Sequence, residues 1–151
     1  MYHLVLVLHS WLRWFALVAG VAATFRSTGS RPESGADRAN MWGLVLMAVL
    51  DLQMLLGLLL YFVLSPLMAV ALRDFGAAVK DPGLRFFAVQ HFGLMLAAVV
   101  VVHVGRVLAR KATAPDSKRM HMFICFGLAT LLMILSIPWP GMVGGRPLFR
   151  I

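Results

Sequence analysis

Residues 2–25, YHLVLVLHSWLRWFALVAGVAATF, form an apolar run long enough to cross a lipid bilayer as a helix. Within this run the hexapeptide His9-Ser10-Trp11-Leu12-Arg13-Trp14 contains two ionisable side chains, those of His9 and Arg13. Ionisable groups are costly in hydrocarbon, and they persist where they face a bundle interior and bind a partner, a cofactor or an ion. No basic residue precedes the run, as one would in a secretory signal, so we expect a retained first transmembrane helix.

The composition is that of an integral membrane protein. Of the 151 residues, 61% are hydrophobic and only 13% are charged, and the mean hydropathy is +0.86. The formal charge of +8 comes from residues in the segments between apolar runs, where positive charge orients helices in a bilayer, so we expect no nucleic-acid binding. The single Cys125 permits no intrachain disulfide, and we interpret it as a small buried apolar residue.

Four apolar runs reach the length of a membrane span, at about residues 2–25, 41–64, 85–110 and 120–139. With short connections they predict an all-α, integral membrane four-helix bundle of up-down-up-down topology, forming one transmembrane domain over residues 1–151. Residues 26–40 have the chemistry of a loop, and Asn40 is a candidate cap for the second helix, which should stop at Ser65-Pro66. A short helix over about residues 67–80 lies either at the membrane interface or against the bundle.

The predicted topology places both termini on one side of the membrane and more of the basic residues on the other. The side opposite the termini carries Arg26, Arg31, Arg38, Arg106, Arg110, Lys111, Lys118 and Arg119, and the side of the termini carries Arg73, Lys80, Arg85, Arg146 and Arg150. The positive-inside rule therefore predicts that the termini lie on the non-cytoplasmic side.

Two histidines share one depth in this topology. At 1.5 Å per residue, His9 lies roughly 10 Å from the side of the termini and His91 roughly 9 Å from it. Histidines at one level on two helices of a bundle are suited to be the two axial ligands of a haem iron, and Gly57 and Gly93 at similar depths would let a flat cofactor approach the backbone. The alternative is that each histidine only hydrogen-bonds a neighbouring helix.

The remaining histidines give a weaker second site. His103 and His121 differ in depth by about 7 Å, and His103 lies on a different face of its helix from His91. They are candidates for a second haem, with an interfacial His121 that contacts lipid headgroups as the alternative interpretation.

Arg13 and Asp51 both fall near the midplane of a hydrocarbon core about 30 Å thick. We expect a structural ion pair between them, with Gln53 satisfying remaining donors, because each charge alone would be costly. The alternative is a proton or quinone site in which Asp51 titrates. Trp11 and Trp14 flank Arg13 and either stack on it, stack on a ring-shaped ligand, or simply fill the core.

Several short motifs together resemble those of a family of small four-helix bacterial inner-membrane proteins often labelled cytochrome-b-like. They are His9-Ser10-x-Leu12-Arg13-Trp14, Asp51-Leu52-Gln53, Leu56-Gly57-Leu58-Leu59-Leu60-Tyr61, Ser65-Pro66, Gln90-His91 with Met95, Gly105-Arg106 and Ile137-Pro138-Trp139-Pro140. The resemblance implies a multi-pass protein of the bacterial inner membrane, with termini in the periplasm, b-type haem and an electron-transfer setting. His9 and His91 match the family's intramembrane histidines.

Taken together, the residues and the resemblance predict a b-type haem-binding subunit that passes electrons between the quinol pool and other membrane redox subunits. We expect one haem b, or two if His103 and His121 hold a second, and a quinone as a further candidate ligand. We expect no independent catalytic activity. The alternative is a non-catalytic accessory subunit of a larger respiratory or photosynthetic membrane complex. A transporter is less favoured, since no internal repeat or broken helix is visible.

Overall fold

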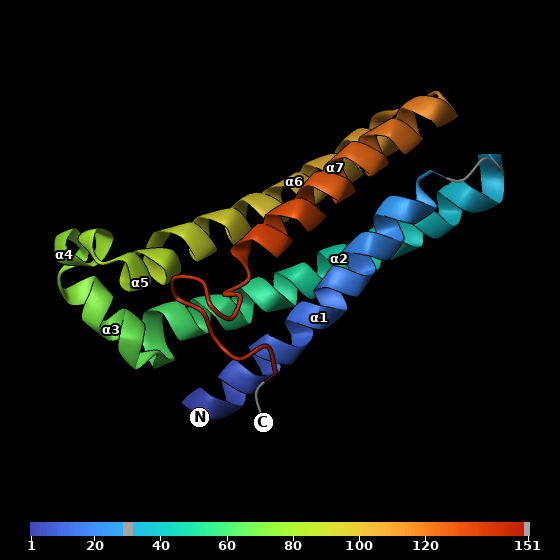
Figure 1. Ribbon diagram of the computed structural model, residues 1–151. Coiled ribbons are helices and arrows are strands. Elements are labelled where there is room, and N and C mark those ends of the chain that lie inside the picture. Colours follow the sequence, from blue (N-terminus) through green and yellow to red (C-terminus); the bar gives the residue numbers. More distant parts are fainter. Residues whose placement is uncertain (29–31, 150–151) are drawn as a thin grey trace.

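In the computed structural model, all regular secondary structure among the described residues is helical (Figure 1). The structure describes residues 1–28 and 32–149, without the side chains of residues 32–39. Four helical stretches within these residues are long and apolar enough to cross a membrane: Tyr2–Ser27, Asn40–Leu64, Pro82–Lys111 and Pro115–Ser136. The prediction of an all-α protein with four helices that could span a membrane is thereby confirmed. Arg31, Arg150 and the side chain of Arg38, which enter the count of basic residues, lie outside the described part.

The chain builds these stretches from α-helices and two π-helical turns. In chain order the elements are α1 (Tyr2–Arg26), α2 (Pro32–Leu59), η1 (Leu60–Leu64), α3 (Pro66–Arg73), α4 (Phe75–Lys80), α5 (Pro82–Arg85), η2 (Phe86–His91), α6 (Phe92–Lys111) and α7 (Pro115–Ser136). The turn η1 continues α2, and η2 joins α5 to α6 without a break. The sequence pattern does not predict either π turn.

The helix bounds differ from the prediction in several places: the third span starts at Pro82 instead of residue 85, α7 ends at Ser136 instead of residue 139, and two helices start well before the predicted residue. Helix α2 starts at Pro32, nine residues before the predicted start at residue 41, so most of the predicted loop is helical. Helix α7 starts at Pro115 instead of residue 120. Both helices therefore start at a proline, which is favoured in the first turn because its fixed φ suits a helix and its missing N–H is not needed there. Asn40 is consequently not a cap, and its carbonyl accepts a hydrogen bond from Arg106 Nη1 at 3.0 Å.

The predicted helix over residues 67–80 is in fact two helices, α3 and α4, because the backbone leaves the helical region at Asp74. Side chains cap each short helix: Met68 N–H donates to Ser65 Oγ, Ala77 N–H to Asp74 Oδ1 and Leu84 N–H to Asp81 Oδ1. The predicted stop of the second span at Ser65-Pro66 is confirmed. A small apolar cluster joins these helices to the bundle, and it comprises Met68, Ala71, Ala78 and Ala88 with Tyr61, Leu84 and Phe87 around them.

The four long helices share one apolar core, in which Leu46, Leu50, Val102, Met122 and Phe126 are fully or almost fully buried. Helix α1 lies against α2 and α7, and α6 lies against α7 and α2. Figure 1 shows α1 with α2 as one pair and α6 with α7 as the other. Helices α1 and α6 are therefore diagonal neighbours, and side chains that both point to the bundle axis can meet there.

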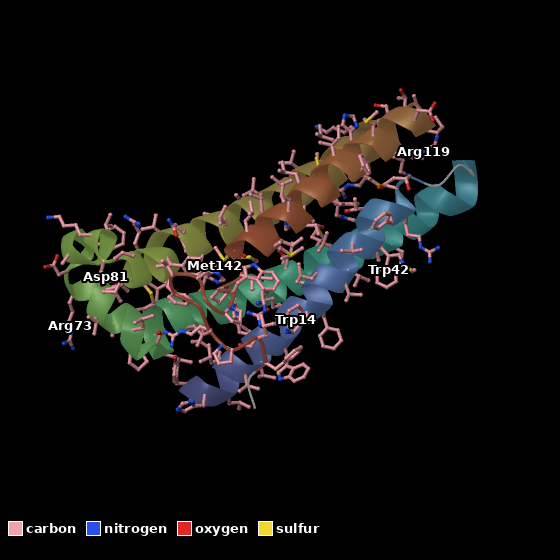
Figure 2. All side chains as sticks on the ribbon, viewed as in Figure 1. Trp14, Trp42, Arg73, Asp81, Arg119 and Met142 are labelled. Carbon is pink, nitrogen blue, oxygen red and sulfur yellow. The ribbon has the colours of Figure 1, made fainter. Side chains whose placement is uncertain are left out.

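Beyond α7, residues 137–149, here called the C-terminal strap, fold back over the bundle to α1 (Figures 1 and 2). Gly144 has a φ of +75° and lies so close to Phe86 that a Cβ there would be 2.9 Å from the ring. The strap ends with Phe149 against the rings of Trp11 and Trp14, whose centres are 5.6 and 5.4 Å away. This segment covers one end of the helix bundle and, as shown below, completes its cavity.

Candidate site at a buried histidine pair

His9 of α1 and His91 at the end of η2 are neighbours inside the bundle. Their ring centres are 6.2 Å apart, and the ring planes are inclined by 67°. The two side chains come from diagonal helices, so each points toward the bundle axis. The common depth inferred from the sequence therefore corresponds to a spatial pair.

The end of helix α7 holds the ring of His91 in place. His91 Nδ1 lies 2.7 Å from the carbonyl oxygen of Ser136, the last residue of α7. A carbonyl oxygen only accepts, so Nδ1 is the donor, and in the neutral imidazole Nε2 then has the lone pair. A histidine that donates its other ring N–H to a carbonyl is the arrangement found around metal-ligating histidines.

His9 lies over Gly57, and its surroundings leave polar groups unsatisfied. A Cβ at Gly57 would lie 3.4 Å from His9 Cε1, an ordinary van der Waals distance, so the ring of His9 is the nearest side chain to this glycine. Gln53 Nε2 donates to the carbonyl oxygen of His9 at 2.9 Å. Within the described part of the chain, buried His9 Nδ1 and Gln53 Oε1 have no hydrogen-bond partner. Buried polar atoms of this kind are uncommon, and a polar ligand or an ordered water at the site would satisfy them.

These residues border a cavity of about 160 Å³. Methionines form much of its apolar wall, namely Met54, Met68, Met95 and Met133. Two cations, Arg13 and Arg146, also line it, and none of its described lining residues is acidic. The cavity is therefore largely apolar, and it is lined by two cations and two imidazoles.

Arg13 contacts the C-terminal strap. Its Nη2 donates to the carbonyl oxygen of Leu148 at 2.7 Å, and its guanidinium lies 5.0 Å from the centre of the Trp14 ring. Trp14 Nε1 donates more weakly to the same oxygen, at 3.4 Å. Of the interpretations considered for the two tryptophans, stacking of Trp14 on Arg13 is observed, together with stacking on Phe149, which the sequence pattern does not indicate.

The prediction of an ion pair between Arg13 and Asp51 is wrong. Among the described residues, Asp51 is paired with His103, whose Nε2 lies 3.6 Å from Asp51 Oδ2. Gln53, two residues from Asp51, points toward α1, and two residues correspond to a rotation of about 200° around a helix. Asp51 therefore faces α6. Depth alone did not fix the direction in which the carboxylate points.

The two histidines expected at a second haem lie in different surroundings. His103 Nε2 lies 3.6 Å from Asp51 Oδ2, and its Nδ1 lies 2.9 Å from the carbonyl oxygen of Val99 in its own helix. His121 lies in the second turn of α7, and its Nδ1 is buried without a partner among the described residues. No ring contact joins the two histidines in the described part. A Cβ at Gly93, the other glycine expected beside a cofactor, would have no atom within 4 Å.

Sequence patterns missed two contributors to the site. Ser136 contributes a backbone carbonyl, which any residue type would supply, so no local signal identifies it. Arg146 lies in the strap, whose path depends on contacts with α1 and η2. Its guanidinium lies 5.4 Å from the centre of the Phe87 ring.

The fold and the site define an all-helical protein with four candidate membrane spans and a buried histidine pair beside a cationic cavity. Comparisons with protein-family models, with curated proteins and with solved structures find no match.

Proposed function

We propose that this protein is a b-type haem-binding membrane subunit in which His9 and His91 are the axial ligands. The observation that carries the proposal is the separation of 6.2 Å between the two ring centres. An imidazole nitrogen binds a first-row metal at about 2 Å, and the ring centre lies about 1 Å behind that nitrogen. Two imidazoles on opposite sides of one iron therefore have ring centres about 6 Å apart.

The chemistry of the two histidines also suits them to bind haem. His91 has its Nδ1 proton committed to Ser136, which leaves Nε2 as the ligating atom. His9 brings a second imidazole with an unsatisfied buried nitrogen, and it comes from the diagonal helix. When bound, haem supplies a one-electron carrier.

The chain's own residues would orient the ligands, exclude water and set the local charge. Ser136 fixes the tautomer and direction of the His91 ring. The methionine-lined wall keeps the surroundings apolar, while Arg13 and Arg146 place positive charge beside the cavity. Positive charge and low polarity near an iron are among the factors by which a protein tunes its reduction potential.

The proposed setting is a bacterial inner membrane, with electrons passing between the quinol pool and a partner redox subunit. The resemblance described from sequence motifs supports this setting, and the excess of basic residues opposite the termini supports periplasmic termini. In this role the protein has no independent catalytic activity.

An absorption spectrum of the detergent-purified protein, oxidised and then reduced with dithionite, tests the proposal. We expect haem bands that His9→Ala and His91→Ala each abolish. The matched control is His103→Ala, which removes an intramembrane histidine that does not line the cavity and should leave the bands unchanged. Absence of haem bands from folded wild-type protein would refute the proposal, and copurification of that colourless protein with large redox subunits would favour the accessory-subunit alternative.

A further inference from the structure

The pair formed by Asp51 and His103 lies within the membrane-spanning part of the bundle and yet on its outer surface. The side chains are 44% and 46% exposed, respectively. Asp51 lies about 16 Å along its helix from the start of its span at Asn40, and His103 about 12 Å from the end of its span at Lys111. With a hydrocarbon core about 30 Å thick, the pair is at the level of lipid chains.

Apolar side chains surround this pair on the two helices that carry it. On α2 these are the exposed Leu44 and Leu55, and on α6 the exposed Leu96 and Val100. We call this surface the α2/α6 face. Ionisable residues inside a membrane almost always face a bundle interior or a water-filled cavity, since lipid chains offer them no hydrogen-bond partner. A half-exposed acid–base pair at this level therefore indicates that protein covers the α2/α6 face.

We propose that a second copy of this chain covers the α2/α6 face, forming a two-fold symmetric dimer. All copies of a membrane protein have the same orientation and depth, so the pair of one copy lies at the level of the pair of its mate. An acid–base pair is self-complementary about a two-fold axis, because the acid of each copy faces the base of the other. The Asp51 and His103 side chains of the two copies would then interact with one another away from lipid.

Charge complementarity is the reason to favour a second copy over an unrelated subunit. An unrelated subunit would need its own polar residue at this level, whereas a second copy brings one through symmetry. The inference is independent of haem binding, because neither Asp51 nor His103 lines the histidine-pair cavity.

Cross-linking in liposomes tests the proposal without changing the pair. In a Cys125→Ala background, Val100→Cys places a thiol on the α2/α6 face, and Val18→Cys places one on an exposed part of α1 at a comparable depth. We expect a short bifunctional maleimide to give dimers with Val100→Cys and few with Val18→Cys. Equal yields from the two variants would overturn the proposal, as would cross-linking in native membranes only to a different protein.

Substitution of the pair tests its role in the same assay. We expect Asp51→Asn and His103→Ala each to weaken dimerisation about tenfold, the size expected for a polar contact between membrane helices. The exchange Asp51→His with His103→Asp keeps one acid and one base, and it should restore dimers. Wild-type dimer yields in both single variants would rule out the pair as the contact.

Discussion

At the residue scale, close helix contacts depend on glycines that are not marked out by any local pattern. A Cβ at Gly105 would lie 2.4 Å from Cys125 Cβ, and one at Gly43 would lie 2.4 Å from the Phe126 ring. Because these glycines have no side chain, α6 and α2 can approach α7 closely. Small residues have this role in membrane bundles, where close approach replaces the hydrophobic effect as the source of attraction.

Gly105→Ala tests this dependence. The added methyl meets a Cβ atom, which cannot move without moving helix α7, so we expect a loss of about 1–3 kcal/mol in the free energy of unfolding. The control is Gly93→Ala on the same helix, where the new Cβ meets nothing within 4 Å. Unfolding of the detergent-solubilised protein by titration with SDS measures both variants. Equal stability of the two would show that the contact is easily relieved.

At the scale of secondary-structure elements, the two π-helical turns η1 and η2 line the cavity. Leu60 and Tyr61 of η1 line it, as do Phe87 and His91 of η2. A π turn inserts a residue into an α-helix and therefore rotates the positions that follow it, and such turns occur frequently at functional sites. The strap closes the remaining side through Pro138, Arg146 and Pro147.

Phe149→Ala tests the attachment of the strap. The substitution removes two ring contacts, with Trp11 and Trp14, each worth roughly 0.5–1.5 kcal/mol beyond buried area. We expect hydrogen exchange of the strap amides, such as that of Arg146, to become about tenfold faster. Phe15→Ala, which removes a phenyl ring from an exposed position of α1, should leave exchange in the strap unchanged. Unaltered exchange in Phe149→Ala would show that other contacts hold the strap.

At the scale of the whole molecule, charged residues mark the two ends of the bundle. Figure 2 shows Arg119 at one end and Arg73 with Asp81 at the other. The end with Arg119 also carries Arg106, Arg110 and Lys111 near the close of α6. Positive charge concentrated at this end predicts that it faces the cytoplasm.

Labelling of single cysteines in spheroplasts tests this orientation. In the Cys125→Ala background, a membrane-impermeant maleimide should label Val143→Cys in the strap in intact spheroplasts. It should label Ser117→Cys, exposed at the start of α7, only after the membrane is permeabilised. The opposite pattern would place the strap and the histidine pair near the cytoplasmic side.

The sequence by itself determined the four spans and the shared level of His9 and His91, because apolar length and rise per residue depend only on local spacing. The tertiary structure alone decided which side chains at one level meet. Asp51 lies beside His103 and not beside Arg13 because its position around α2, about 200° from that of Gln53, turns its side chain toward α6. The contacts of Arg13 with the strap and of His91 with Ser136 join residues 135 and 45 positions apart, and no local pattern records such contacts.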